Sequence, residues 1–353
     1  MNIFAIDLGN KQAKLKSERG EYVYPSSYLS FEDIPKGGII DRKLHGNHLF
    51  QLSSEDEAYV WGDNLQAYRM SDNMIQTLGY GNRFDGKIGK RLFEFALGRL
   101  AADFPEAKEK PMDIRLVMGV PADEFYEDSE QVNTLRKMAV GKHIVRVDGA
   151  DYMINVPDVS CTLIMPQYMG SVLHTAFDEK GNEDTEISKR TIGVVDIGGG
   201  TILANIVTNL EQSSAPQCVN EGVRTLLKQL VAKSHVTKEY ALEMMLKTGN
   251  STDGYIYNPN GGQRDIQDLT DVVEGVKEAY VRRHVAKFIK DSFPSPNEVD
   301  VILLTGGGAN LVSFETIADE IGMNYAEKLE LVEQSERANV RGYKKAANLV
   351  WSE

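Results

Sequence analysis

The sequence predicts a two-lobe α/β protein in which both lobes follow the same plan. Residues 4–16 and 194–207 each have an apolar strand, an aspartate, a glycine-containing turn and a second strand. A third glycine-rich segment, 305–310, follows another apolar strand. The chain has 353 residues, and single hydrophobic cores stop growing at about 250–300 residues, so two lobes are expected. Internal duplication explains the repeated strand pair most simply.

Composition indicates an ordinary soluble protein, with 42% hydrophobic and 26% charged residues. The net charge of −13 argues against a broad surface for nucleic acid or membrane. The two cysteines, Cys161 and Cys218, suggest neither a disulfide framework nor a metal site, which favours a reducing compartment. The sequence has no signal-peptide pattern and no apolar run of about 18 residues. We therefore expect a cytoplasmic protein that does not enter the membrane.

The first lobe is expected to comprise residues 1–160 together with the C-terminal segment 335–353, which has a helical pattern. Residues 20–84 are rich in Gly, Asp, Asn and Ser, so they predict a small, mobile insertion in this lobe. The other elements follow from the spacing of apolar residues. They are helices over 85–104 and 127–140, and strands over 113–121, 143–147 and 152–156.

The second lobe is expected to comprise residues 161–334, with a small insertion at about 211–264 that contains a turn-rich stretch. Apolar strands and amphipathic helices are again predicted from residue periodicity. The strands are 161–165, 191–197 and 202–208. One helix begins at Pro166, and three more span 221–234, 237–248 and 265–291. Residues 299–312 are expected to form a strand, a glycine turn and the start of a helix.

The strand–aspartate–glycine turn is well suited to a polyphosphate. Glycine lets the backbone approach phosphate oxygens and lets successive N–H groups point at them. An aspartate at the end of the strand can hold a hydrated magnesium ion, which neutralises phosphate charge. Asp7 or Asp196 alone would be interpreted as a turn or capping residue. Two copies in one chain favour a nucleotide clamp.

The segment TGGGAN at 305–310 has neither the Walker pattern nor the glycine spacing of a dinucleotide fold. Glycines before a helix N-terminus fit the α-phosphate and sugar of a nucleotide. The alternative is a tight turn between a strand and a helix. Lys247 could line the sugar or base, or it could be a solvated lysine.

The order of these motifs resembles the superfamily of actin, heat-shock chaperones and sugar kinases. The motifs are AIDLGNKQAKL, MGVPADEFY, LIMPQYMGSVLHTAF, GVVDIGGGT, LLTGGGANL and RANVRGYKKAA, and together they span nearly the whole chain. The length and VRGYKKAA near the end resemble the bacterial actin-like ATPases of the ParM type, which segregate plasmids. The resemblance implies an actin-like fold, with duplicated ribonuclease-H-like domains around a nucleotide cleft.

The resemblance also implies site residues for ATP and Mg²⁺. Asp7 and Asp196 would hold the magnesium through water. Gln167 falls where relatives place the residue that orients the attacking water; ParM-type proteins commonly have Glu there and actin has Gln. The alternative for Gln167 is an ordinary residue at a helix start. The other implied nucleotide-binding residues are Gly9, Asn10, Lys11, Lys14, Gly198, Gly199, Gly200, Thr201, Gly306, Gly307, Gly308 and Asn310.

The function implied is an ATPase whose hydrolysis is stimulated by polymerisation, with GTP as a possible alternative nucleotide. Its partners would be copies of itself in a filament and a DNA-binding adaptor on a plasmid centromere, without direct contact to nucleic acid. Two alternatives stay open. One is a bacterial actin relative for cell shape or assembly. The other is a small-molecule kinase of the same superfamily, which needs an acidic base that the sequence does not identify.

Overall fold

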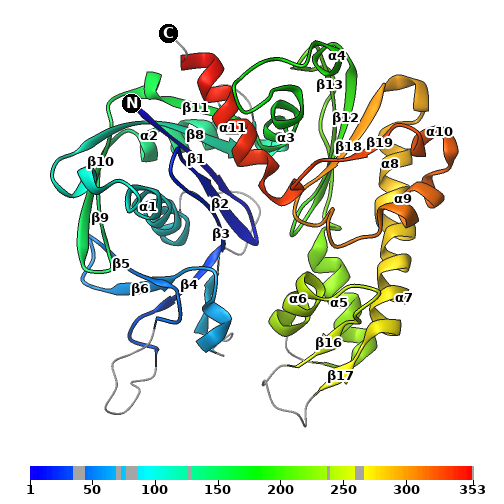
Figure 1. Ribbon diagram of the computed structural model, residues 1–353, viewed down its shortest axis with the longest axis horizontal. Coiled ribbons are helices and arrows are strands. Elements are labelled where there is room, and N and C mark those ends of the chain that lie inside the picture. Colours follow the sequence, from blue (N-terminus) through cyan, green and yellow to red (C-terminus); the bar gives the residue numbers. More distant parts are fainter. Residues whose placement is uncertain are drawn as a thin grey trace. The chain divides into compact units, whose positions relative to one another are not determined.

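Two β-sheets, one in each of two units, organise the computed structural model (Figure 1). Unit 1 comprises Met1–Glu183 and Asn339–Glu353, and unit 2 comprises Asp184–Ala338. The structure describes residues 1–34, 44–68, 73–76, 84, 86–125, 129–236, 239–258 and 266–351. No helix in these ranges is both long enough and apolar enough to span a membrane.

Unit 1 has a mixed sheet of eleven strands among its described residues, in the order β3-β2-β1-β8-β10-β9-β5-β6-β4-β7, with β11 pairing with β8. The strands are β1 (Asn2–Leu8), β2 (Gln12–Lys16), β3 (Glu21–Pro25), β4 (Ser27–Ser30), β5 (His48–Leu52), β6 (Ala58–Trp61), β7 (Ile75–Gln76), β8 (Met112–Val120), β9 (Gly141–Val147), β10 (Ala150–Val156) and β11 (Thr162–Pro166). The helices are α1 (Lys87–Ala101), α2 (Glu130–Ala139), α3 (Gln167–Ala176) and most of α11 (Ser335–Trp351). Short 3₁₀ turns are η1 (Leu65–Tyr68), η3 (Pro105–Lys108), η4 (Ala122–Glu124) and η5 (Val159–Cys161).

Unit 2 has a six-stranded sheet in the order β14-β13-β12-β18-β19, with β15 pairing with β13, and a separate hairpin. The sheet strands are β12 (Thr191–Ile197), β13 (Ile202–Thr208), β14 (Glu211–Gln212), β15 (Gln217–Val219), β18 (Val301–Thr305) and β19 (Leu329–Leu331), and the hairpin is β16 (Ile256–Tyr257) with β17 (Gln267–Asp268). The helices are α4 (Thr185–Ser188), α5 (Val223–Ser234), α6 (Glu239–Thr248), α7 (Thr270–Tyr280), the π turn η7 (Val281–Val285), α8 (Ala286–Ser292), the 3₁₀ turn η8 (Pro296–Glu298), α9 (Phe314–Ile321) and α10 (Met323–Ala326).

The two units share the strand plan that the sequence predicts. In unit 1, β1 pairs antiparallel with β2 and parallel with β8, and β8 pairs parallel with β11. In unit 2, β12 pairs antiparallel with β13 and parallel with β18, and β18 pairs parallel with β19. The predicted fold class is therefore confirmed.

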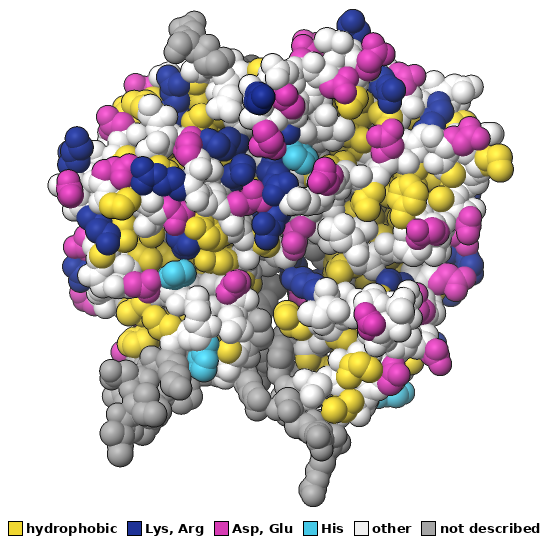
Figure 2. Space-filling model, in the orientation of Figure 1, with side chains coloured by type: hydrophobic (Ala, Val, Ile, Leu, Met, Phe, Trp, Pro, Cys, Tyr) yellow, Lys and Arg dark blue, Asp and Glu magenta, His cyan; other side chains and the backbone are white. Residues whose placement is uncertain are grey.

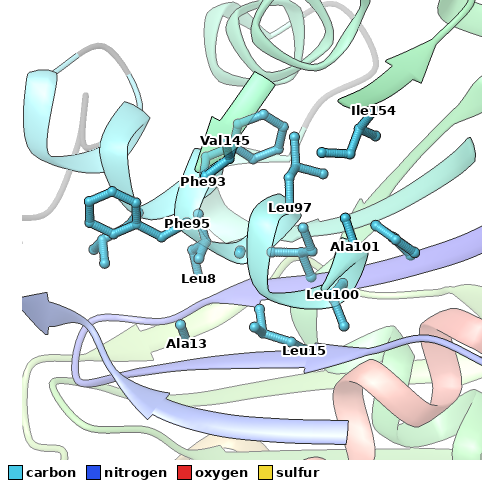
Figure 3. Packing of buried hydrophobic residues seen from close by; sticks show 14 of the residues in the cluster. Leu8, Ala13, Leu15, Phe93, Phe95, Leu97, Leu100, Ala101, Val145 and Ile154 are labelled. Atoms are coloured by element: carbon cyan, nitrogen blue, oxygen red, sulfur yellow. The ribbon is translucent and has the colours of Figure 1, made fainter. Parts of the chain in front are cut away.

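Helix α1 forms the centre of the unit 1 core. Its apolar side chains pack on two sides, with Phe93 and Leu97 toward Val145 and Ile154 of β9 and β10, and Leu100 toward Leu15 of the first strand pair (Figure 3). These side chains are all buried, with at most 8% of their surface exposed. Burial of large apolar side chains contributes about 1.5–3 kcal/mol each, so this packing fixes the first strand pair against α1.

The described part of residues 20–84 is not the mobile insertion that the sequence predicts. Tyr28, Tyr59 and Trp61 are fully buried, and each ring lies within 6.0 Å of Phe95 in α1, centroid to centroid. Their strands β4 and β6 belong to the main sheet of unit 1. The turn-rich composition misled the prediction, because a few aromatic side chains supply most of the burial here.

The boundary between the units also differs from the prediction. It lies between Glu183 and Asp184, instead of at residue 160. Strand β11 pairs with β8 in the first sheet, and its Ile164 and Met165 are buried there. An apolar strand after a proline carries no local signal for the sheet that it joins, so the sequence could not place it. At the other end, the first residues of α11 belong to unit 2.

Helix α11 returns to unit 1 and packs against α3. Ser171 Oγ donates to Oδ1 of Asn339 at 2.7 Å, and the ammonium of Lys345 donates to the carbonyls of His174 and Phe177 at 2.9 and 2.6 Å. These carbonyls lie at the end of α3, where helix carbonyls have no intrahelical partner. The C-terminal helix therefore fixes the helix that begins with Gln167.

A buried histidine links α1 to β9. The Nδ1 atom of His143 lies 2.9 Å from Oε1 of Glu94, and its Nε2 atom lies 2.9 Å from the carbonyl of Ala139. Both partners are acceptors, so the imidazole satisfies both only when it is protonated on both nitrogens. Burial lowers the pKa of His143, but the hydrogen bond and the charge of Glu94 raise it more, and the net result is a pKa above 6.5.

We expect the protein to lose stability as the pH rises above 6.5 through the folded-state pKa of His143. The folded state binds this proton more tightly than the unfolded state. This contribution is therefore fully present below the unfolded-state pKa and is lost at higher pH. Thermal unfolding from about pH 6 to about pH 9 would measure it. The variant His143→Gln should have a flatter profile, and parallel profiles would contradict the role of protonated His143.

Candidate functional site

The first glycine turn joins β1 to β2 and is held from one side by Ser26. Gly9 N–H donates to the carbonyl of Gln12 at 2.9 Å, which closes the turn. Ser26 donates from Oγ to the carbonyl of Gly9 at 2.5 Å and from its N–H to the carbonyl of Lys11 at 2.9 Å. In a trans peptide the N–H points opposite to the C=O. The N–H groups that follow these carbonyls therefore face away from Ser26.

Three predicted residues meet at the end of β1. Asp7 is only 1% exposed, and its Oδ2 accepts from Lys14 Nζ at 3.1 Å while its Oδ1 accepts from Gln167 Nε2 at 2.8 Å. Asp7 and Lys14 are directly opposite in the β1–β2 register. A buried carboxylate requires such compensation, because an unpaired buried charge is strongly destabilising. The arrangement holds Asp7 in one orientation.

Gln167 is the first residue of α3, directly after Pro166. Its backbone carbonyl accepts a hydrogen bond from Tyr343 Oη in α11 at 3.3 Å. Because the amide nitrogen donates to Asp7, the amide oxygen Oε1 is the group that can accept a hydrogen bond from elsewhere. The side chain therefore presents a fixed acceptor beside Asp7.

The second glycine turn joins β12 to β13 and repeats the first. Gly198 N–H donates to the carbonyl of Thr201 at 2.8 Å. The carbonyls of Gly198, Gly199 and Gly200 accept from the N–H groups of Val223, Arg224 and Gly222 at 3.0, 2.9 and 3.1 Å. All three carbonyls thus face the start of α5. The N–H groups of the following peptides face the other side, as a phosphate-binding turn requires.

Gly222 is a site residue that the sequence analysis missed. A Cβ at this position would lie 2.5 Å from Gly198 O, from Gly200 C and from Thr201 N. Only glycine allows the start of α5 to approach the turn this closely. The available signal was a glycine directly before an amphipathic helix, which the sequence analysis treated as an ordinary helix start.

The third glycine segment packs against the end of β12. Gly306 has a φ of +87°, and a Cβ there would collide with Oδ1 of Asp196. Gly308 N–H donates to the carbonyl of Ile197 at 2.8 Å, and Ser335 Oγ donates to the carbonyl of Gly306 at 3.0 Å. This segment and Asp196 therefore form one cluster within unit 2.

One detail of the third glycine segment differs from the prediction. Helix α9 begins only at Phe314, with Ser313 as its cap, so the glycines do not lie at a helix N-terminus. They form a turn against β12 instead.

The structure also places the remaining predicted residues. Lys247 lies near the end of α6, where its Nζ is 3.5 Å from Oε1 of Glu243, one helical turn earlier. Gly307 is half-buried and Asn310 is exposed.

The described residues contain no group of three or more His, Cys, Asp or Glu side chains that could hold a metal ion directly. Asp7 and Asp196 lie near the ends of β1 and β12, one in each unit. Magnesium is commonly bound by one or two carboxylates, several waters and the substrate's phosphates. A carboxylate of this kind suits a magnesium ion held through water, and the predicted magnesium site stays a prediction.

Two family models match separate parts of the chain. The model described as the actin like proteins N terminal domain matches residues 5–170, and the Alp7A C-terminal domain matches residues 191–334. Together they span both candidate hairpins and the third glycine segment. No curated protein sequence matches the chain significantly.

Solved structures resemble the chain over nearly its full length. The apo psk41 ParM protein is 23% identical, with a TM-score of 0.73, and the match covers 99% of this chain and 98% of that chain. The actin-like protein Alp7A is 16% identical, with a TM-score of 0.77 and coverage of 99% and 97%. ParM of Bacillus thuringiensis with AMPPNP is 16% identical, with a TM-score of 0.67 and coverage of 100% and 99%. Likeness at these identities establishes a common fold.

Proposed function

Since the chain belongs to the actin-like proteins, we propose that it hydrolyses ATP and forms filaments that segregate a low-copy plasmid. The pair of matched glycine turns carries the proposal. Each turn has its carbonyls bonded on one side, to Ser26 in unit 1 and to residues 222–224 in unit 2. The opposite side of each turn therefore presents N–H groups suited to phosphate oxygens.

Hydrolysis then depends mainly on positioning and on neutralising charge. Lys14 and Gln167 hold the Asp7 carboxylate, so that it can orient the water shell of a magnesium ion. Asp196, fixed beside Gly306, has the same role in unit 2. The bound magnesium would supply charge neutralisation at the phosphates. The Oε1 atom of Gln167 would accept a hydrogen bond from the attacking water and align it.

The nucleotide assignment is supported by a relative of the same fold. Bacillus thuringiensis ParM was crystallised with AMPPNP, an ATP analogue. The present chain has a glycine turn with a strand-end aspartate in each unit, and unit 2 also contains the third glycine segment. We infer ATP, with magnesium, as the nucleotide of this chain.

We further propose that DNA is reached through an adaptor protein in the cytoplasm. The chain carries a net charge of −13, which repels a polyanion. Figure 2 shows Lys and Arg side chains interspersed with Asp and Glu on the face in view. Such a mixed surface suits a protein partner better than a phosphate backbone.

We expect the protein to sediment as filaments with magnesium and ATP, or with a slowly hydrolysed analogue, above a threshold concentration. ADP should support sedimentation poorly, because loss of the γ-phosphate removes contacts that hold the assembly-competent state. Phosphate release measured in the same samples should rise when filaments form. A protein that stays monomeric but phosphorylates a small acceptor would contradict this function and support the kinase alternative.

A further inference from the structure

The long helix of unit 2 contains a π turn at a single place. Helices α7 and α8 are continuous through Val281–Val285, and the N–H of Ala286 bonds to the carbonyl of Val281, five residues earlier (Figure 1). π turns are rare in helices and frequently occur at functional sites.

Tyr280 and His284, at this turn, both contact Glu221. Tyr280 Oη donates to the carbonyl of Glu221 at 2.6 Å, and His284 Nδ1 lies 3.3 Å from its Oε2. The two rings stack loosely, with centroids 5.5 Å apart. Nε2 of Gln229 lies 3.2 Å from His284 Nε2. An amide nitrogen can only donate, so His284 Nε2 accepts and the neutral ring carries its proton on Nδ1, the atom that lies near Glu221.

Glu221 directly precedes the residues that hold the second glycine turn. The N–H groups of Gly222, Val223 and Arg224 bind the three carbonyls of Gly198–Gly200. A shift of the Glu221 backbone would therefore move these donors relative to the turn. All of these contacts lie within unit 2.

We propose that Tyr280 and His284 are positioning residues for phosphate binding. They fix Glu221, and through it the start of α5 and the glycine turn, in the arrangement in which the N–H groups of the turn face the phosphates. This inference rests on the proposed nucleotide function and extends it to residues outside the glycine motifs.

The hydroxyl of Tyr280 is the stronger of the two contacts. Its side chain is fully buried, whereas the Glu221 carboxylate is partly exposed, which weakens its interaction with His284. Burial raises the pKa of Tyr280, so the hydroxyl keeps its proton and remains a donor at any physiological pH. Phenylalanine would remove this one hydrogen bond and keep the ring.

The chain offers a matched control in Tyr325, whose Oη donates to the carbonyl of Phe293 at 2.7 Å in the same unit. Both substitutions, Tyr280→Phe and Tyr325→Phe, remove one hydroxyl-to-carbonyl hydrogen bond, but only the first lies next to the glycine turn. We expect Tyr280→Phe to weaken ATP binding about three- to tenfold, in proportion to one hydrogen bond. Its affinity for adenosine, which has no phosphate, should be unchanged. Tyr325→Phe should change neither affinity.

Fluorescence titration with ATP and competition with adenosine would measure these affinities. A Tyr280→Phe protein that loses affinity for ATP and adenosine equally, or that matches Tyr325→Phe, would overturn the inference. His284→Leu should have the same direction of effect as Tyr280→Phe and serves if that variant does not fold. If the unsubstituted protein binds no ATP, the proposed function itself is wrong.

Discussion

Replacement of Gln167 by alanine should leave ATP binding and filament assembly intact and slow phosphate release by about 10²–10⁴-fold. The amide acts on the attacking water, an interaction that matters mainly in the transition state, so its loss lowers the rate and leaves ground-state affinity unchanged. Filaments of the variant should therefore persist after assembly. Phosphate release in sedimented filaments, measured together with ATP affinity, gives both quantities.

A suitable control is Gln51→Ala, because Gln51 also lies in unit 1 and donates one amide hydrogen bond, to the carbonyl of Asp56 at 3.2 Å. It should hydrolyse ATP at the normal rate. An unchanged rate in assembled filaments of Gln167→Ala would show that this residue only begins α3. A loss of ATP affinity equal to the loss of rate would show instead that Gln167 acts through Asp7, its hydrogen-bonded neighbour.

Replacement of Asp196 by alanine should reduce magnesium-dependent ATP turnover by about a hundredfold or more, because metal-ion stabilisation of phosphate charge contributes several kcal/mol. The carboxylate lies against Gly306 at the end of β12, so its removal also takes away one neighbour of the third glycine segment. Turnover and ATP affinity should both be measured over a range of magnesium concentrations.

The matched control is Asp300→Ala. Asp300 lies just before β18, and its Oδ2 accepts from the N–H of Thr191 at 2.8 Å, so it supports the start of β12 while Asp196 lies near its end. The control should keep normal turnover. Equal activity of Asp196→Ala and the unsubstituted protein would show that the second hairpin does not hold the magnesium.

Local patterns explain what the sequence predicted well. The strand–glycine turn–strand pattern predicted the first hairpin, and in that hairpin Asp7 and Lys14 lie opposite each other, although the sequence analysis did not predict their pairing. The second turn is likewise local, because its glycines, Gly198–Gly200, are consecutive in the sequence. Both strand pairs, and the helix over 335–351, could therefore be predicted from periodicity and turn residues.

Contacts between distant residues explain what the sequence did not predict. Ser26 holds the first turn and Gly222 holds the second, but each reaches its turn only through tertiary packing. The aromatic residues Tyr59 and Trp61 lie in a turn-rich stretch whose average composition hides their burial. Similarly, nothing in an apolar helix pattern marks the π turn after Tyr280.

The packing of α11 on α3 has a consequence for synthesis of the chain. Ser171 and Asn339, which bond across these helices, are 168 residues apart in sequence. At about 5–20 residues per second, α3 is made roughly 10–30 s before the helix that it packs against. All of unit 2 up to Ala338 is synthesised in that interval. Unit 1 therefore cannot finish folding on the ribosome before unit 2 has been made, and Gln167 gains its support from α11 last.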